Sequence, residues 1–401
     1  MKKIWKRVCS LLLLISCMSG VQALAEEDIP KELEHLYARG AVLMDGGSGR
    51  ILFGKNENEV LPMASTTKIM TCILALENGG ENVVAKVSAN AAAQPEVKLG
   101  VRQGEEYAVR DLLYSLMLES HNDSAVVIAE CIGGSVEQFA TMMNEKAVQI
   151  GCVNTHYVTP NGLDERDAGG EHSTTAAELA KVMSYCVGAS PMRDKFLEIT
   201  QTRSYQFEDQ SGRRSFSCQN HNAFLDMMDG VISGKTGFTS AAGYCYVCAL
   251  EDGGRRFIVA LLACGWPYNR TYKWSDTKLL MEYGLENYEN RAPEYVQDLE
   301  PLPVKGGLSQ SKNPWEDAWA PLAVEPPARH NYLLAKNEHI VSRVVIKKEL
   351  LAPAEKGAVV GKVSYYLEDK LLEEYPVTVA QEVQRRYLEH WFSWMWRNYM
   401  L

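Results

Sequence analysis

A serine and a lysine lie one helical turn apart in this chain. Ser65 and Lys68 begin and end the stretch Ser-Thr-Thr-Lys, and positions i and i+3 share a helix face, so the amine can reach the hydroxyl. The apolar neighbours Ile69 and Met70 would lower the pKa of the amine by desolvation. A neutral lysine could then take the serine proton, which predicts nucleophilic catalysis. A helix-capping serine followed by an exposed lysine is the alternative interpretation of this motif alone.

Two further motifs follow later in the chain. Ser120-His121-Asn122 and Lys235-Thr236-Gly237 come after Ser65 in the order of S-x-x-K, S-D-N and K-T-G in class A β-lactamases and penicillin-binding proteins. Taken separately, the first could be a helix-capping turn and the second the end of a surface hairpin. Three motifs in the right order are much harder to obtain by chance than one, so together they favour an active-site serine enzyme.

Longer segments carry the same resemblance. They are residues 41–52, which read as a hairpin, residues 161–163, residues 172–175 and residues 237–245. With them the chain resembles the low-molecular-mass penicillin-binding proteins, serine-type D-alanyl-D-alanine carboxypeptidases of peptidase family S11, over about residues 38 to 290. The resemblance implies an α/β (α+β) domain of the β-lactamase/transpeptidase type, an antiparallel sheet with a helical insert.

The resemblance implies a catalytic role for three residues. Ser65 would attack the carbonyl of the penultimate D-alanine of a peptidoglycan stem pentapeptide, and Lys68 would accept the serine proton. Ser120, hydrogen-bonded to Lys68, would relay a proton to the departing D-alanine, and water would then hydrolyse the acyl-enzyme. β-Lactam antibiotics would acylate the same serine.

The resemblance also implies a set of substrate-binding residues. Lys235 and Thr236 would bind the terminal carboxylate, and the backbone N–H groups of Ser65 and Phe238 would form the oxyanion hole. Arg270 resembles a family arginine near the substrate carboxylate, although a solvated loop arginine fits it equally well. The full set is Asn122, Lys235, Thr236, Gly237, Phe238 and Arg270.

Two histidines and one glutamate bear on the alternatives. His121 occupies a position where the family more often has glycine, and its imidazole could titrate near neutral pH. His172 is expected to belong to a helix N-cap and is left out of catalysis. A β-lactamase would need a glutamate to activate the deacylating water; Glu165 lies near the right region, but the residues after it do not resemble that loop. A catalytically inactive wall-binding protein is the alternative from a different class.

The composition excludes several kinds of partner. The chain has 401 residues, 46% of them hydrophobic, and 51 acidic against 41 basic residues give a net charge of -10. An acidic chain without a basic stripe is not expected to bind nucleic acid. Its eight histidines show no paired-ligand spacing, so neither a metal nor another cofactor is expected.

The cysteines read as buried thiols. Cys9 and Cys17 lie in the amino-terminal segment, and the other eight of the ten are scattered through apolar surroundings rather than spaced as a disulfide scaffold. Cys245 and Cys248 form a C-x-x-C pattern within a β-rich run. Positions three apart on a strand face opposite sides, so neither a redox pair nor a metal clip is favoured.

The amino terminus reads as an export signal. Basic residues precede the apolar run 8–18, which is too short for a permanent membrane span, and Ala23-Leu24-Ala25 offers a cleavage site. Lipidation at Cys17 is the alternative. We therefore expect a protein at the outer face of the cytoplasmic membrane or in the cell wall.

The order of patterns predicts the domains. Strands at 40–54, 234–238, 243–250 and 256–264 bracket helices at 65–76, 109–117, 124–132 and 136–150, and a helix follows at 273–285. The resulting division is a signal peptide at 1–25, a catalytic domain at 26–292, a small all-β domain at 293–380 and an amphipathic helix at 381–401. A proline-rich loop is expected at 313–329. Tryptophans and arginines in the final helix favour a helix lying on a membrane surface over one docked on the β domain.

Overall fold

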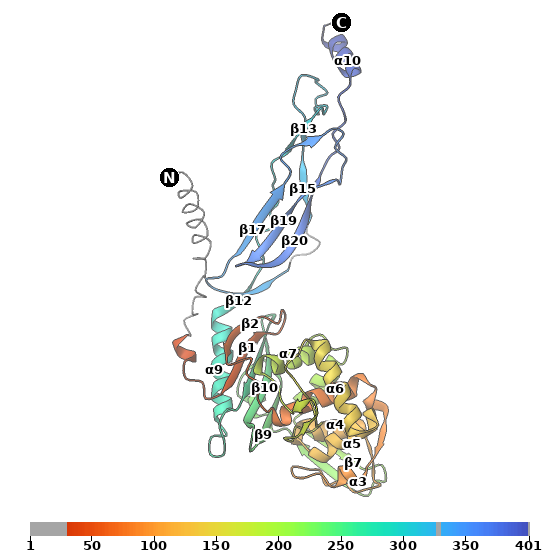
Figure 1. Ribbon diagram of the computed structural model, residues 1–401, viewed down its shortest axis with the longest axis vertical. Helices are drawn as coiled ribbons and strands as arrows, with labels where there is room; N and C mark the ends of the chain where they lie inside the picture. The colour runs from red at the N-terminus through yellow and green to blue at the C-terminus, as the bar shows by residue number, and fades with distance from the viewer. Residues whose placement is uncertain (1–29, 326–329, 400–401) are drawn as a thin grey trace, which may run out of the picture.

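The computed structural model describes residues 30–325 and 330–399, so the predicted signal peptide lies outside the described residues. Figure 1 shows an elongated molecule, with a globular domain at one end and a narrow β domain rising from it. The carboxy-terminal helix lies at the far tip of the β domain. The active-site motifs and this helix therefore lie at opposite ends of the molecule.

A five-stranded antiparallel sheet forms the centre of the globular domain, in the order β2-β1-β11-β10-β9. Its strands are β1 (Gly40–Asp45), β2 (Ile51–Lys55), β9 (Val231–Thr239), β10 (Gly243–Asp252) and β11 (Arg255–Leu262). The predicted strands are confirmed, with β9 and β10 longer than expected. The strand β9, which carries Lys235-Thr236-Gly237, is an edge of this sheet and is open to a ligand on one side.

Both faces of the sheet are buried. The helix α9 (Tyr272–Asn287) covers one face, where Cys248 and Leu250 of β10 are buried. The helical insert covers the other face, where Cys245 and Val247 are buried. Cys245 and Cys248 thus face opposite sides, as predicted, and all eight cysteines in the described part of the chain are free.

The insert is mostly helical, as predicted. Its longer helices are α2 (Lys68–Glu77), α4 (Val109–Tyr114), α5 (Asn122–Gly133), α6 (Val136–Ile150), α7 (Ala176–Val187) and α8 (Arg193–Gln201). Its short helical turns are η2 (Ala64–Thr67), η3 (Gly80–Asn82), α3 (Ala89–Ala92), η5 (Ala223–Asp226) and the π-helical η4 (Ser115–Glu119), whereas η1 (Lys31–Leu33) precedes β1 and lies outside the insert. Three small hairpins complete it: β3 (Val84–Lys86) with β4 (Glu106–Ala108), β5 (Arg166–Asp167) with β6 (Gly170–Glu171), and β7 (Ser204–Glu208) with β8 (Ser215–Gln219).

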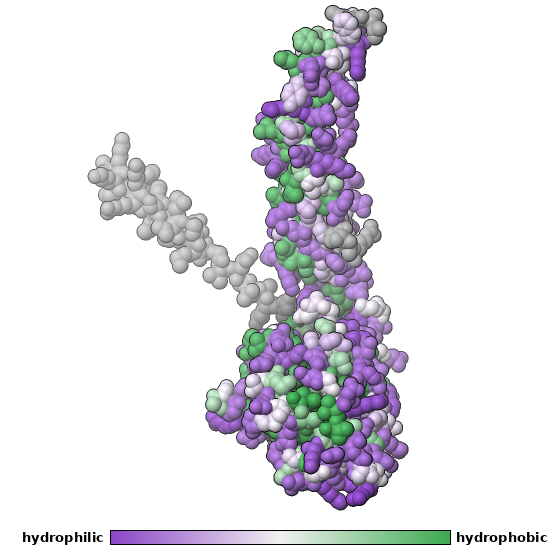
Figure 2. Space-filling view, turned by 90° about the vertical axis from the view of Figure 1, so that its right-hand side faces the viewer, coloured by the Kyte–Doolittle hydropathy of each residue, from purple (hydrophilic) through white to green (hydrophobic). Residues whose placement is uncertain are grey.

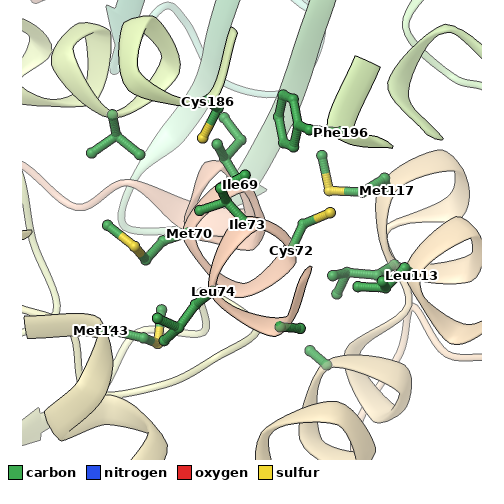
Figure 3. Close-up of a cluster of buried hydrophobic side chains, with 14 of the residues drawn as sticks. Ile69, Met70, Cys72, Ile73, Leu74, Leu113, Met117, Met143, Cys186 and Phe196 are labelled. Atoms are coloured by element: carbon green, nitrogen blue, oxygen red, sulfur yellow. The ribbon is translucent and has the colours of Figure 1, made fainter. Parts of the chain in front are cut away.

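The helix α2 runs through the middle of this core. Every residue from Lys68 to Leu76 is buried. Figure 3 shows Ile69, Met70 and Ile73 surrounded by side chains from neighbouring helices, among them Cys186 and Phe196. A helix that is apolar all round can be buried on every side, so α2 fixes the position of the lysine at its start.

The β domain is built from short sheets. A four-stranded sheet has the order β15 (Leu322–Val324), β20 (Lys370–Val379), β19 (Val359–Leu367), β17 (Ile340–Ile346), and a three-stranded sheet the order β14 (Trp319–Ala320), β13 (Leu302–Lys305), β18 (Leu350–Leu351). The loop expected at 313–329 is wrong in part, because β14 and β15 lie within it and pair with distant strands.

The two domains are joined by backbone pairing and an ion pair. The strand β12 (Tyr288–Arg291) at the end of the globular domain pairs with β16 (Tyr332–Ala335). Arg50 directly precedes β2, and its Nη1 lies 2.7 Å from Oε1 of Glu338 in the β domain. These contacts fix the base of the β domain on the globular domain.

The carboxy-terminal helix is shorter than predicted. The helix α10 spans Leu388–Tyr399, whereas a helix was expected over the whole of 381–401. The residues before it are extended because Val383 bridges to Ala354 and Arg385 bridges to Gly307. None of the helices in the described ranges is long and apolar enough to cross a membrane.

Candidate active site

Ser65 lies in the 3₁₀ turn η2, directly before α2. In space this turn packs between the loop of Gly162 and the edge strand β9. The residue before it, Ala64, has a φ of +48°, in the left-handed region. Gly162 packs on this turn so closely that a Cβ there would lie 2.0 Å from the Ala64 carbonyl oxygen, and a Cβ on Gly237 would lie 2.9 Å from the Ser65 nitrogen. Both glycines are therefore required for the backbone to approach the serine.

Lys68 is completely buried and has three partners. Its Nζ lies 2.9 Å from Ser65 Oγ, 2.9 Å from Asn122 Oδ1 and 2.5 Å from the carbonyl oxygen of Asn161. Burial lowers the pKa of Lys68 well below the ordinary lysine value, and the nearby charge of Lys235 lowers it further. Loss of water favours the neutral amine, which is the form that can accept a proton.

Ser120 differs from the expectation in its partner. It has a φ of +67° and ends the π-helical turn η4. Its Oγ accepts a hydrogen bond from Lys235 Nζ at 2.9 Å, whereas a hydrogen bond to Lys68 was expected. The reason is that Ser65, Asn122 and the Asn161 carbonyl already occupy the positions around the Lys68 amine.

The K-T-G motif lies on the open edge of the sheet. Lys235 is 3% exposed, and burial lowers its pKa to about 7. Thr236 is half-buried, and its hydroxyl has no hydrogen-bond partner in the described part of the chain. Phe238 is 41% exposed and its ring packs on Tyr244 at 4.7 Å between centroids. The strand thus offers a cation, a hydroxyl and its own backbone beside Ser65.

Arg270 is not brought into contact with these groups. It is exposed in the loop between β11 and α9, and its carbonyl oxygen accepts a hydrogen bond from Lys273 Nζ at 2.5 Å. Among the described residues its guanidinium has no hydrogen bond to Lys235 or Thr236. The structure thus places the Arg270 side chain in solvent on this loop.

Two residues near the site were missed or set aside. The backbone carbonyl oxygen of Asn161 accepts a hydrogen bond from Lys68. This contact could not be predicted from residue types, because every residue has a backbone carbonyl. His172 is buried, with Nε2 2.7 Å from Thr67 Oγ1, while Nδ1 accepts a hydrogen bond from the Val158 N–H at 2.9 Å. The N-cap expected at His172 is provided instead by Thr175, whose hydroxyl accepts from the Glu178 N–H.

His121 lies partly buried beside the Ser120 turn. Burial lowers the pKa of His121 below its ordinary value, which favours the neutral ring. Its Nδ1 lies 2.8 Å from Ser115 Oγ, which in turn lies 2.7 Å from Ser124 Oγ. The side chain therefore supports the turn that carries Ser120 and Asn122.

The site is built from serine, lysine and amide groups. Within residues 30–325 and 330–399 no group of three or more His, Cys, Asp or Glu side chains is placed to hold a metal ion. What the site offers is a hydroxyl beside a desolvated amine, with a second cation on the neighbouring strand. This arrangement suits acyl transfer through a serine ester.

Comparisons with known proteins agree with this chemistry. Residues 26–264 match the family described as D-alanyl-D-alanine carboxypeptidase, and residues 333–385 match the C-terminal domain of penicillin-binding protein 5. The chain is 28% identical over 394 residues to the D-alanyl-D-alanine carboxypeptidase DacF of Bacillus subtilis, covering 95% of each chain.

Solved structures give the same result. The D-alanyl-D-alanine carboxypeptidase DacD of Francisella tularensis superposes with a TM-score of 0.66 at 25% identity, covering 92% of this chain and 99% of that one. Penicillin-binding protein D2 of Listeria monocytogenes, in its ampicillin-bound form, superposes with a TM-score of 0.54 at 28% identity, covering 63% and 99%. The mixed α/β fold followed by an all-β domain is thus confirmed, and the chain belongs to the D-alanyl-D-alanine carboxypeptidase family, peptidase S11.

Proposed function

We propose that this protein hydrolyses the terminal D-Ala-D-Ala bond of peptidoglycan stem peptides through an acyl-enzyme on Ser65. The observation that carries the proposal is the environment of Lys68, a fully buried amine 2.9 Å from the Ser65 hydroxyl. Family membership supports the substrate class, and the geometry supports the assignment of the reacting groups. No cofactor is required for this chemistry.

The three partners of Lys68 match a neutral amine. Such an amine has two N–H groups and one lone pair. The two N–H groups donate to Asn122 Oδ1 and to the Asn161 carbonyl oxygen, at 2.9 and 2.5 Å, which directs the lone pair to the Ser65 hydroxyl. Lys68 is therefore the general base that takes the serine proton as Ser65 Oγ attacks the peptide carbonyl.

The remaining motif residues act on the substrate. The backbone N–H groups of Ser65 and Phe238 stabilise the oxyanion, and Lys235 with Thr236 binds the terminal carboxylate. The proton that Lys68 takes from Ser65 passes on to the leaving D-alanine amine with Ser120 as the relay, so that Lys68 and Ser120 both regain their starting forms; Ser120 Oγ is positioned by a hydrogen bond from Lys235. Water then hydrolyses the ester and releases the shortened peptide.

The acyl-enzyme also explains reaction with β-lactams. A β-lactam presents a strained amide and a carboxylate to the same groups, so we propose that it acylates Ser65. Rapid release would make the protein a β-lactamase, but Glu165 is exposed and its carboxylate accepts from the N–H of Arg166. A long-lived penicilloyl ester is therefore the expected product.

The domain division supports a place at the membrane surface. We propose an exported protein in which residues 26–292 are catalytic, residues 293–380 act as a spacer, and the final helix lies on the outer face of the cytoplasmic membrane. Figure 1 shows this helix at the tip farthest from the catalytic domain. Such a layout would hold the active site away from the bilayer and towards the peptidoglycan.

Mass spectrometry tests the proposed reaction. The purified protein is incubated with benzylpenicillin and, separately, with a peptide ending in D-Ala-D-Ala. We expect a stable penicilloyl adduct on Ser65 and release of one D-alanine, both absent from Ser65→Ala and both retained in Ser211→Ala, a serine in an exposed turn. A protein that forms no adduct and releases no D-alanine would instead support the inactive wall-binding alternative.

A further inference from the structure

The helix α10 is turned with its polar face towards the β domain. His390, Ser393, Trp394 and Arg397 recur at helical spacing and line a groove against that domain. The opposite face carries exposed apolar side chains: Leu388 (77% exposed), Phe392 (68%), Met395 (40%), Trp396 (65%) and Tyr399 (77%). A helix packed on a water-soluble domain normally buries its apolar face. The reversed orientation leaves that face for another apolar partner.

The groove between α10 and the β domain is cationic. It measures about 430 Å³, and its polar lining includes Ser311, Lys312, Gln384, His390, Ser393 and Arg397. No carboxylate from the described ranges lines the groove. The Glu316 carboxylate lies behind one lining residue, Ser311, and accepts a hydrogen bond from its Oγ at 2.5 Å. Within the described residues neither Lys312 nor Arg397 has an ion-pair partner. The groove therefore offers an anion these two cations together with the Gln384 amide and the Ser393 hydroxyl.

A tryptophan loop joins the helix to form one surface. Trp315 is 68% exposed, and its ring meets that of Trp391 edge to face at 4.3 Å. The Arg386 guanidinium lies 5.6 Å from the Trp391 ring centroid and donates to the carbonyl of Pro314. Figure 2 shows hydrophobic side chains gathered at this tip of the molecule. Aromatic rings with nearby arginines suit the boundary between lipid and water.

We propose that the groove binds the phosphate headgroup of an anionic phospholipid while the apolar face of α10 rests on the acyl chains. An α-helix is about 10 Å across, and an interfacial helix sinks roughly 5–10 Å into the headgroup and acyl boundary. The groove on its upper side would then lie at the level of the headgroups. This inference rests on the membrane location proposed above and adds the class of lipid and the residues that bind it.

Vesicle flotation of the exported chain, residues 26–401, tests the inference. The two lipids are phosphatidylcholine alone and an equal mixture with phosphatidylglycerol. The groove variant is Lys312→Gln with Arg397→Gln, and its charge-matched control is Lys356→Gln with Arg385→Gln, two exposed cations outside the groove. Phe392→Ser with Trp396→Ser removes the apolar contact.

We expect the wild-type chain to bind the mixed vesicles more tightly than phosphatidylcholine. The groove variant should lose roughly thirtyfold in affinity for the mixed vesicles, from about 1 kcal/mol for each cation, and keep its affinity for phosphatidylcholine. The control should lose less than about threefold, because its cations act only through the screened surface field. The apolar variant should lose binding to both lipids.

Several results would overturn the inference. Equal losses in the groove and control variants would mean that charge acts diffusely, and equal wild-type binding to both lipids would remove the preference for an anion; in both cases the membrane location itself would stand. Displacement by millimolar glycerol phosphate at constant ionic strength would make free phosphate the ligand. Failure to bind any vesicle, or concentration-dependent self-association that covers the helix, would remove the membrane location as well.

Discussion

The two lysines of the active site are buried, whereas at the opposite tip of the molecule cations and aromatic rings face solvent. Lys68 is 0% exposed and Lys235 is 3% exposed, and burial lowers the pKa of both. Lys312 and Arg397 lie in an open groove instead. Exclusion of water thus prepares Lys68 to act as a base, whereas the cations of the tip stay open to a ligand from solvent.

The apolar residues differ in the same way. The helix α2 buries every residue from Lys68 to Leu76, while α10 buries none. Burial of α2 contributes to the stability of the catalytic domain and fixes its geometry. The exposure of α10 means that this helix adds little to stability and leaves its apolar surface for binding. Substitutions at the two ends should therefore separate catalysis, stability and binding from one another.

The largest expected effect comes from Lys68→Met. Methionine is close to lysine in length and apolar, so the core remains filled, but the base is lost. We expect the rate of acylation by benzylpenicillin to fall about a thousandfold, since general bases contribute factors of this order. The free energy of unfolding should change by less than about 2 kcal/mol, because relief of desolvation opposes the lost hydrogen bonds.

Lys146→Met is the matched control. Lys146 Nζ lies 2.6 Å from Glu77 Oε2, a carboxylate whose side chain is 10% exposed. Removing the amine should lower the free energy of unfolding by about 1–3 kcal/mol, because a poorly solvated carboxylate loses its ion-pair partner and keeps only the hydrogen bonds from Tyr185 and Ser190. Acylation should keep the wild-type rate. If Lys146→Met slowed acylation as strongly as Lys68→Met, the distinction between a reactive and a structural lysine would be lost.

The pH dependence of kcat/KM sharpens the comparison between the two buried lysines. The rate should fall as pH decreases, because Lys68 must be neutral and becomes protonated below its lowered pKa. It should also fall as pH rises above about 7, because Lys235, with its pKa near that value, loses the charge that binds the carboxylate. Lys235→Arg should keep the acidic limb and abolish the fall at high pH, since arginine stays charged. An unchanged high-pH limb in this variant would assign that limb to another group.

A smaller effect is expected from Thr67→Val. Thr67 Oγ1 donates to the Ala64 carbonyl at 2.8 Å and lies 2.7 Å from His172 Nε2. Because His172 Nδ1 accepts from the Val158 N–H at 2.9 Å, Thr67 connects the Ser65 turn through His172 to the segment that leads to Asn161. We expect acylation to slow roughly tenfold through misplacement of the reacting groups. Thr155→Val, which loses hydrogen bonds to Thr174 and Glu178, should leave the rate unchanged. Equal slowing in both variants would show that general destabilisation is responsible.

Sequence patterns predicted the parts of the site that depend on residue type. Ser65, Lys68 and Asn122 were expected to be neighbours, and they are. Residue types and helical spacing can both be determined from a sequence, and this prediction depended on nothing else. The partner of Ser120 was wrong because Lys68 is satisfied by the Asn161 carbonyl. Every residue has a backbone carbonyl oxygen, so the sequence does not show which one will contact Lys68. That contact depends on the conformation of the loop around Asn161.

The fold was predictable where elements are long. The strands β9, β10 and β11 and the helix α6 follow from local periodicity. The strands β14 and β15, of two and three residues, form only because they meet β13 and β20, more than ten residues away. The start of α10 at Leu388 has the same cause, because Val383 and Arg385 bridge to distant parts of the β domain. Long-range pairing of short segments leaves no periodic signal.

The smallest effect on the catalytic end should come from deleting residues 388–401. Because α10 buries no side chain, the melting temperature should fall by less than about 2 °C, and release of D-alanine from a soluble peptide should keep its rate. Binding to phosphatidylglycerol-containing vesicles should be lost, since the apolar face and one wall of the cationic groove are removed together. Circular dichroism, the peptide assay and flotation measure the three quantities on one preparation. Retained vesicle binding would place the membrane contact elsewhere on the chain. A large loss of stability would mean that the tip supports the fold. Either result would remove the contrast between the two ends of the molecule.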